Sequence, residues 1–74
     1  MVQTALKNQI RRLRFEHDEM TQKQLAALTG CTRQTINAIE AAKYSPSLEL
    51  AFKIAQIFGL KVDDVFSYGD EIEK

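Results

Sequence analysis

Three polar side chains, those of Arg33, Gln34 and Asn37, fall at neighbouring positions of one predicted helix. Arginine presents two donors in the geometry of guanine O6 and N7, and the glutamine amide matches adenine N6 and N7. Asn37 follows Arg33 by one turn and is placed to reach a base edge or a nearby phosphate. This combination favours the reading of base pairs, and the alternative is a helix face that is simply solvated.

Residue types that catalysis or metal binding requires are sparse. His17 is the single histidine and Cys31 the single cysteine, which leaves neither a serine–histidine pair nor a cysteine-based zinc site. The adjacent Asp63 and Asp64 are explained more simply as a helix cap than as a cation site. We therefore expect no enzyme activity, no cofactor and no bound metal. The lone cysteine also favours a reducing, cytoplasmic location.

Capping residues and glycines divide the chain into short helices. The first helix is expected over residues 4–17, because Leu6, Ile10 and Leu13 repeat at helical spacing. Thr21, Thr32 and Ser47 are predicted N-caps, and Gly30 and Gly59 are predicted stops. Further helices are expected over residues 21–30, 33–41 and 47–58, with a last short turn that starts at Asp63 or Asp64 and packs Val62, Val65 and Phe66 inward.

A turn of three or four residues separates the second and third predicted helices, which is the signature of a helix-turn-helix. The second helix is expected to bury Leu25 and Leu28, and the third to bury Ile36 and Ile39. The fourth helix is apolar around most of its circumference and is therefore expected to be central and buried. The sequence predicts an all-α domain.

Charge is distributed unevenly although the formal total is zero. Residues 1–44 carry seven basic and four acidic side chains, a net of +3, whereas residues 45–74 carry three basic and six acidic side chains, a net of −3. Such a dipolar molecule can present its basic half to phosphates. Mixed surface charge without functional meaning is the alternative.

Length and hydropathy bound the organisation of the chain. Its 74 residues suffice for a single small domain over residues 1–74, in which residues 67–74 form a short C-terminal tail. No apolar run has the length of a signal peptide or of a membrane span. At this size we expect the domain either to be marginally stable or to gain part of its stability from a partner.

Two segments resemble a known family, the Cro/repressor (Xre-type) helix-turn-helix regulators. They are TQKQLAALTGCTRQTINAIE and KYSPSLELAFKIAQIFGL, and the resemblance covers residues 10–66. It implies a lambda-repressor-like bundle of four to five helices whose third helix lies in the major groove of double-stranded DNA. Two departures are visible: the turn before the second helix is one residue longer, and Ala41-Ala42 stands where the family usually has a glycine.

The resemblance and the helix termini nominate further contacts. Arg14 and Glu40 are expected to form an internal ion pair that ties the first helix to the end of the third. Isolated cations such as Arg11 and Lys23 are expected to contribute only to the general field. The predicted phosphate contacts lie at helix N-termini and just after the third helix: Thr21, Gln22, Thr32, Thr35, Lys43, Tyr44 and Ser45.

A homodimer that represses transcription from a palindromic operator is the predicted assembly, because one such domain buries little surface on DNA. Residues 1–3 and 66–68 are expected to pair as a small sheet. The alternative is a protein-interaction module, such as the antitoxin of a toxin–antitoxin pair, with the acidic tail on a basic partner. The predicted dimer contact is apolar and C-terminal: Phe58, Leu60, Val62, Val65, Phe66 and Tyr68.

Overall fold

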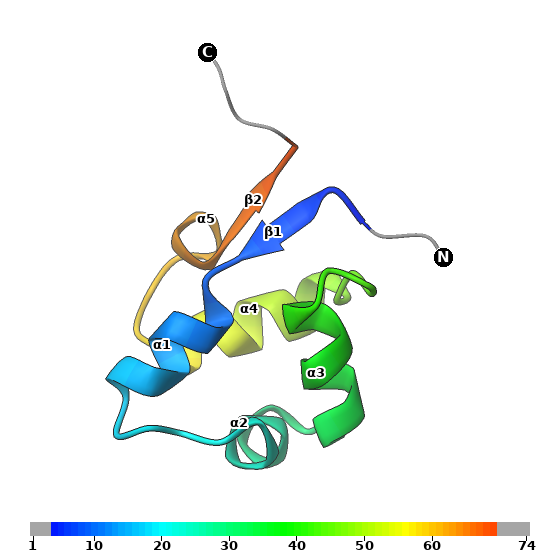
Figure 1. Cartoon of the computed structure of the whole chain (residues 1–74). Coiled ribbons are helices and arrows are strands. Elements are labelled where there is room, and N and C mark those ends of the chain that lie inside the picture. The colour runs from blue at the N-terminus through cyan, green and yellow to red at the C-terminus, as the bar shows by residue number, and fades with distance from the viewer. Residues whose placement is uncertain (1–3, 70–74) are drawn as a thin grey trace.

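The computed structural model describes residues 4–69. These residues form a small helical bundle with a two-stranded antiparallel ribbon (Figure 1), which confirms the predicted helical bundle and its β-pair. The elements follow one another in the order β1 (Leu6–Asn8), α1 (Ile10–Glu16), α2 (Gln22–Thr29), α3 (Arg33–Glu40), α4 (Leu48–Ile57), α5 (Val62–Val65) and β2 (Phe66–Tyr68).

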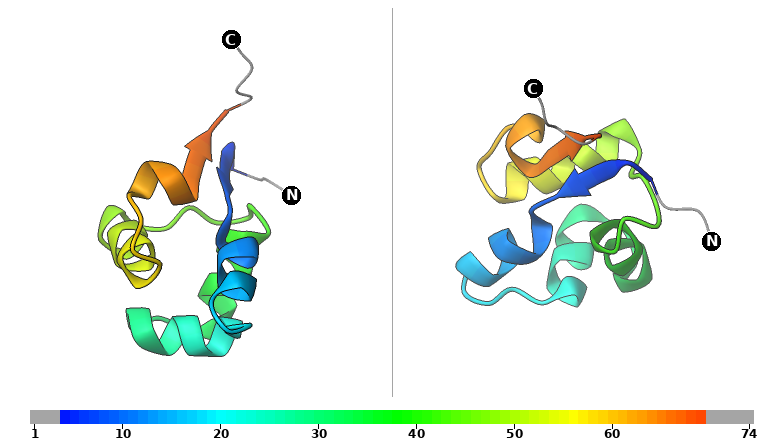
Figure 2. Two further views of the ribbon diagram at one scale, coloured as in Figure 1. Left: turned by 90° about the vertical axis from the view of Figure 1, so that its left-hand side faces the viewer. Right: turned by 45° about the horizontal axis from the view of Figure 1, so that its top comes forward.

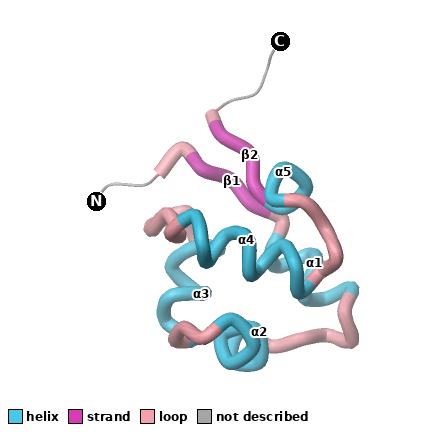
Figure 3. The backbone as a smooth tube through the Cα atoms, turned by 180° about the vertical axis from the view of Figure 1, so that it is seen from behind, coloured by secondary structure: helices cyan, strands magenta, loops and turns pink. Residues whose placement is uncertain are grey.

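The helices surround one core. The left view of Figure 2 shows α1 and α3 on one side of the bundle and α4 and α5 on the other. Helix α2 closes the end opposite the ribbon, and the view from behind in Figure 3 shows α4 crossing the back of the molecule. The side formed by α1, α2 and α3 is therefore free of the C-terminal elements.

The chain before α1 is a strand and not the start of a helix. β1 pairs with β2 in the register Leu6↔Tyr68, Lys7↔Ser67 and Asn8↔Phe66. Leu6 lies four residues before Ile10 and so matches helical spacing, yet it packs against the core from the strand. The pairing partner is almost the whole chain away, which a local pattern does not reveal. The segment expected to pair with residues 66–68 was residues 1–3, which lie outside the described residues, and the structure pairs residues 66–68 with β1 instead.

Six large side chains form the centre of the core, and every helix supplies at least one of them: Ile10, Leu25, Ile36, Ile39, Ile54 and Val65. The prediction that Leu28 is buried is wrong, since its side chain is 58% exposed. Thr29 takes the inward position instead, and its hydroxyl donates to the carbonyl oxygen of Leu25 at 2.9 Å. The hydroxyl therefore has an acceptor despite its burial.

Helix α4 is less enclosed than its apolar composition suggests. Ala51, Ile54 and Ala55 are buried, whereas Leu48 and Phe52 are exposed. A bundle of this size covers only one face of the helix, because the remaining elements are too short to surround it. The expectation of a helix buried on nearly all sides is therefore wrong.

Hydroxyl caps start three of the helices as predicted. The Thr21 side chain accepts from the backbone N–H of Gln24 at 3.0 Å while the Gln24 side chain accepts from the Thr21 N–H at 2.8 Å, which completes a capping box. Thr32 and Ser47 cap α3 and α4. The prediction that the last turn starts at Asp63 or Asp64 is wrong, since the cap of α5 is Lys61, whose N–H donates to Asp64 Oδ2 at 3.1 Å.

Two helices end on the same hydrogen-bonded turn with different residues. After α4, Gly59 takes a φ of 68° and Leu60 N–H donates to Ala55 at 3.0 Å. After α3, Ala42 takes a φ of 60° and Lys43 N–H donates to Ala38 at 2.9 Å. This is the Schellman arrangement, in which a left-handed residue follows the helix. Helix α3 thus ends sharply although no glycine is present there.

The longer turn between α1 and α2 is accommodated by two left-handed residues. Asp18 has a φ of 59° and Glu19 a φ of 54°. Met20 N–H then donates to the carbonyl oxygen of Arg14 at 2.9 Å, which returns the chain to the bundle. Across residues 4–69, no helix is both long and apolar enough to cross a membrane.

Candidate nucleic-acid interface

Helix α3 has one face in the core and one in solvent. Ile36 and Ile39 are buried, and Thr32 fixes the start of the helix by accepting from the Thr35 N–H at 3.1 Å. Arg33, Gln34 and Asn37 are exposed on the side away from the two isoleucines. Core packing therefore determines which side chains the helix presents outward.

The polar groups of this face are largely unpaired within residues 4–69. Arg33 and Gln34 have no side-chain hydrogen bond or ion pair there. Asn37 Oδ1 accepts from Gln22 Nε2 at 3.5 Å, at the limit of a hydrogen bond. A side chain that reads bases must keep its donors and acceptors free for the ligand, and this face meets that requirement.

Arg14 and Glu40 are brought together as the resemblance implies. Arg14 Nε donates to Glu40 Oε2 at 2.7 Å and Arg14 Nη2 donates to Glu40 Oε1 at 3.0 Å, with side chains 15% and 10% exposed. Arg14 Nη1 also donates to the carbonyl oxygen of Met20 at 2.7 Å. This bidentate pair fastens α1 to the last residue of α3 and so holds the orientation of the exposed face.

The side chain of Gln22, a residue expected to contact phosphate at the start of α2, also takes part in a contact within the domain. Its amide nitrogen donates to Glu40 Oε1 at 3.2 Å, so the side chain joins the start of α2 to the end of α3. Because the carboxylate can only accept, this bond also fixes which end of the Gln22 amide faces it. Only the backbone N–H of Gln22, at the first position of α2, remains directed outward at the helix start.

The N-terminus of α2 begins after the Thr21 cap, and that of α3 begins after the Thr32 cap, directly behind the turn that joins the two helices. Both helices have eight residues. The Thr21 hydroxyl caps α2, and the Thr32 and Thr35 hydroxyls lie 2.9 Å apart in a mutual hydrogen bond. Both caps are thus engaged locally, and the first backbone N–H groups of each helix are the ones left for an anion.

Lys43, Tyr44 and Ser45 follow the turn that ends α3 and are exposed. Ser45 Oγ donates to Thr4 Oγ1 at 3.0 Å, and Thr4 N–H donates to the carbonyl oxygen of Ala42 at 2.9 Å. The segment before β1 therefore supports the segment after α3. Lys43 and Tyr44 keep their side-chain ends free in this part of the chain.

The six residues expected at a dimer contact fall into two groups. Phe58, Val65 and Phe66 are buried in the core of the single chain, so little of their apolar surface is left for a second copy. Leu60 and Tyr68 are exposed, and Val62 is half-buried. Any contact with a second copy at this end of the molecule falls on the exposed members.

Sequence reasoning undervalued two side chains that meet α3. Asn8 Nδ2 donates to the carbonyl oxygen of Ile39 at 2.9 Å and so anchors β1 to the end of α3. Arg11 lines a hollow of about 410 Å³ together with Gln22, Asn37 and Ala41. In the sequence, Arg11 and Arg14 are three residues apart and so lie on one side of the helix, and this basic pair was the available signal for Arg11. Within residues 4–69 no cluster of histidine, cysteine or acidic residues is suited to a metal ion.

Known proteins match this chain over nearly the whole helical bundle. A family model described as "Helix-turn-helix" matches residues 10–65. An uncharacterised HTH-type transcriptional regulator of Methanocaldococcus jannaschii is 52% identical over 66 residues, which is 89% of this chain and 98% of the relative. An uncharacterised HTH-type transcriptional regulator of Bacillus subtilis, YgzD, is 42% identical over 66 residues, again 89% of this chain and 98% of the relative.

A solved structure shares the fold. It is a crystal structure of a Bacteroides fragilis protein described as a candidate DNA-binding protein, with a TM-score of 0.71 and 22% identity. The match covers 84% of this chain and 98% of that one. The likeness extends over nearly the whole described bundle.

Proposed function

The chain belongs to the Xre-type helix-turn-helix family of transcriptional regulators, and from this membership we propose that it reads a palindromic operator as a homodimer and represses transcription there. Helix α3 enters the major groove in this proposal, with Arg33 and Gln34 on base edges and Asn37 on a base edge or phosphate. The bound dimer excludes other proteins from the operator, which is the mode of repression.

The observation that carries this proposal is the contrast between the two faces of α3. Ile36 and Ile39 lock the helix into the core, while Arg33, Gln34 and Asn37 stand exposed with donors and acceptors available. A protein-binding face is expected to show exposed aromatic or large aliphatic side chains at these positions. The chemistry of the face therefore favours base pairs over a protein partner.

Phosphate contacts flank this face in the proposal. The first backbone N–H groups of α2 and α3 point toward one strand, where Thr21, Gln22, Thr32 and Thr35 are located. Beyond the other end of α3, Lys43 and Tyr44 lie in position for a second stretch of backbone, together with the neighbouring Ser45.

A dimer suits the size of the molecule. The chain measures 34 × 27 × 21 Å. Two copies joined end to end along the longest axis have centres about 34 Å apart, which is the half-site spacing of two-fold readers. We assign the contact to the exposed Leu60 and Tyr68 with the half-buried Val62, positioned by Phe58, Val65 and Phe66 from the core.

Selection of DNA from a random library tests this function. We expect enrichment of a palindromic sequence with half-sites about one helical turn apart. An enriched site without two-fold symmetry would rule out the dimeric arrangement. No enrichment even at low salt would point to a protein partner instead of DNA.

A further inference from the structure

Three arginines on α1 differ sharply in what they contact. Arg12 Nε donates to Gln9 Oε1 at 3.1 Å, and Arg12 Nη1 lies 3.2 Å from Glu16 Oε2. Arg14 is held by Glu40. Arg11, by contrast, has no ion pair and no side-chain hydrogen bond with any residue the structure describes. The uncompensated positive charge of this helix is therefore located at Arg11.

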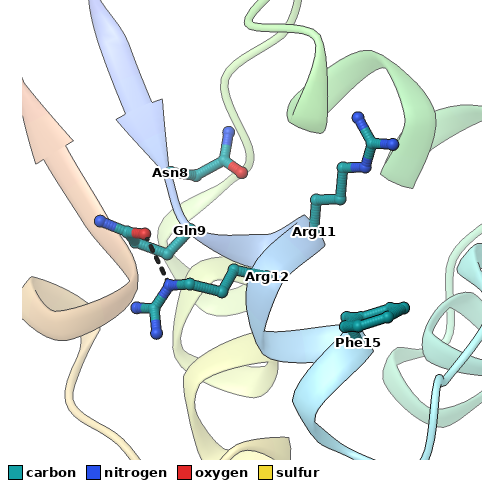
Figure 4. Close-up of a pocket in the computed structure, with 5 residues that line it drawn as sticks. All are labelled: Asn8, Gln9, Arg11, Arg12 and Phe15. Atoms are coloured by element: carbon teal, nitrogen blue, oxygen red, sulfur yellow. Dashed lines mark hydrogen bonds between the residues drawn. The ribbon is translucent and has the colours of Figure 1, made fainter.

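Arg11 also lies beside α3, the helix proposed to enter the major groove. Figure 4 shows its side chain extending from α1 toward the ribbon of α3, whereas Arg12 turns back to Gln9. Arg11 lines the hollow of about 410 Å³ that Asn37 and Gln22 border, and it lines a second hollow of about 500 Å³ with Asn8 and Phe15. It thus forms the ridge between two shallow depressions.

Phe15 is the second unusual feature of this surface. It follows Arg11 by four residues, one helical turn, and its side chain is 69% exposed. The ring lines the same hollow as Arg11 (Figure 4). The carboxylates of Glu16 and Glu40 are each paired with an arginine. Glu19, whose backbone N–H donates to the Phe15 carbonyl oxygen at 3.2 Å, has no ion pair among residues 4–69. A cation and an apolar ring side by side match the alternating phosphate and sugar of a nucleic-acid strand.

We propose that the DNA contact surface extends onto α1, with one phosphate of the strand that borders α3 bound by Arg11. The Phe15 ring packs against the neighbouring deoxyribose. This inference rests on the proposed function, because DNA bound by α3 brings its strand to this side of the molecule. Arg11 becomes a specific backbone contact, whereas its sequence position alone predicts only a share in the general field.

Arg12 provides a matched control for Arg11. Both are arginines of one helix at adjacent positions, and both substitutions remove one positive charge. Arg11→Ala is expected to weaken binding to a library-selected duplex about tenfold, the loss of a charge-assisted hydrogen bond. The slope of log K against the logarithm of the salt concentration should become shallower by about 0.9, the contribution of one phosphate contact. Arg12→Ala should bind within about twofold of the wild type.

Two further variants separate the parts of the contact. Arg11→Lys keeps the charge and should retain the salt dependence of the wild type. Phe15→Ala removes an apolar contact and should lower affinity while leaving the salt dependence unchanged. In a scan with single methylphosphonates, one neutral linkage should weaken the wild type and have no further effect on Arg11→Ala.

Equal losses for Arg11→Ala and Arg12→Ala would overturn the inference, since they would show only a long-range field. An affinity of Arg11→Ala within twofold of the wild type would overturn it as well, while leaving the proposed function intact. A phosphate contact is independent of sequence, so the same comparison on a mixed-sequence duplex at low salt decides the matter if no sequence is enriched. Absence of all DNA binding by the wild type would overturn both proposals.

Discussion

Arg14 and Glu40 lie 26 positions apart in the chain, yet Arg14 Nε and Glu40 Oε2 are 2.7 Å apart and join α1 to the end of α3. Helix α3 is thus held at its C-terminal end by a partly buried ion pair. Its N-terminal half is held by the apolar contacts of Ile36. The orientation of the exposed face proposed to read bases depends on both attachments.

Removal of one partner of this pair should destabilise the domain. Glu40→Ala leaves the Arg14 guanidinium partly buried without its carboxylate, and we expect a loss of about 2 kcal/mol, below the 3–5 kcal/mol of a fully buried pair because some solvent reaches it. Arg14→Ala should cost a similar amount. The measurement is thermal or urea unfolding, completed to a double-mutant cycle.

A surface pair on the same helix supplies the reference for that cycle. Arg12 and Glu16 are 56% and 52% exposed, and we expect their coupling energy to be at most about 0.5 kcal/mol. A coupling between Arg14 and Glu40 no larger than this would contradict the role assigned to the internal pair.

Ala42 should be improved by glycine. Its φ of 60° places an L-residue in the left-handed region, which costs about 1–2 kcal/mol. Glycine relieves this strain, but its greater freedom in the unfolded chain costs about 0.4–1 kcal/mol of folding free energy. Ala42→Gly should therefore stabilise the folded domain by about 0.5–1 kcal/mol. Chemical denaturation of the two variants measures the difference.

Gly59 occupies the equivalent turn after α4 and gives the reverse test. A β-carbon added there meets no atom within 4 Å, so Gly59→Ala reports backbone strain and unfolded-chain entropy without a steric clash. We expect a loss of about 0.5–1 kcal/mol, equal and opposite to the gain at Ala42. If Ala42→Gly lowers stability while Gly59→Ala also lowers it, the two turns are not equivalent and the strain at Ala42 is relieved in another way.

The dimer contact is tested at Tyr68, whose side chain is 77% exposed. Tyr68→Ser should shift the molecule toward monomer in sedimentation velocity, with little change in the stability of the single domain. Phe15→Ser is the control, because it removes a similarly exposed aromatic that lies on α1 and not on β2, and it should leave the association unchanged. The same sedimentation profile for wild type and Tyr68→Ser would place the contact elsewhere.

Local signals in the sequence predicted the starts of α2, α3 and α4 but not those of α1 and α5. Thr21, Thr32 and Ser47 each accept a hydrogen bond from the first turn of a helix, as their types and positions indicate. Such caps depend on neighbours within three residues, so one sequence contains the whole interaction. The exposed set on α3 was predictable for the same reason, since helical spacing separates it from Ile36 and Ile39.

Contacts between distant segments were not predictable in this way. Leu6 matches the spacing of α1 and yet belongs to a strand whose partner is Tyr68. Leu28 fits the apolar stripe of α2, but the elements packed on that helix cover Thr29 instead. The free state of Arg11 follows only once the partners of Arg12 and Arg14 are known. Each of these outcomes depends on tertiary neighbours that periodicity does not specify.

Base reading by Arg33 is the central claim, and a comparison of Arg33→Ala with Lys43→Ala on a randomised duplex library tests it most directly. Arg33→Ala should relax the preference at one position of each half-site, a loss of about 1–3 kcal/mol in discrimination. Lys43→Ala should weaken all sequences alike and reduce the salt dependence by about 0.9, the share of one phosphate. A uniform loss across all sequences for both variants would contradict base reading by α3.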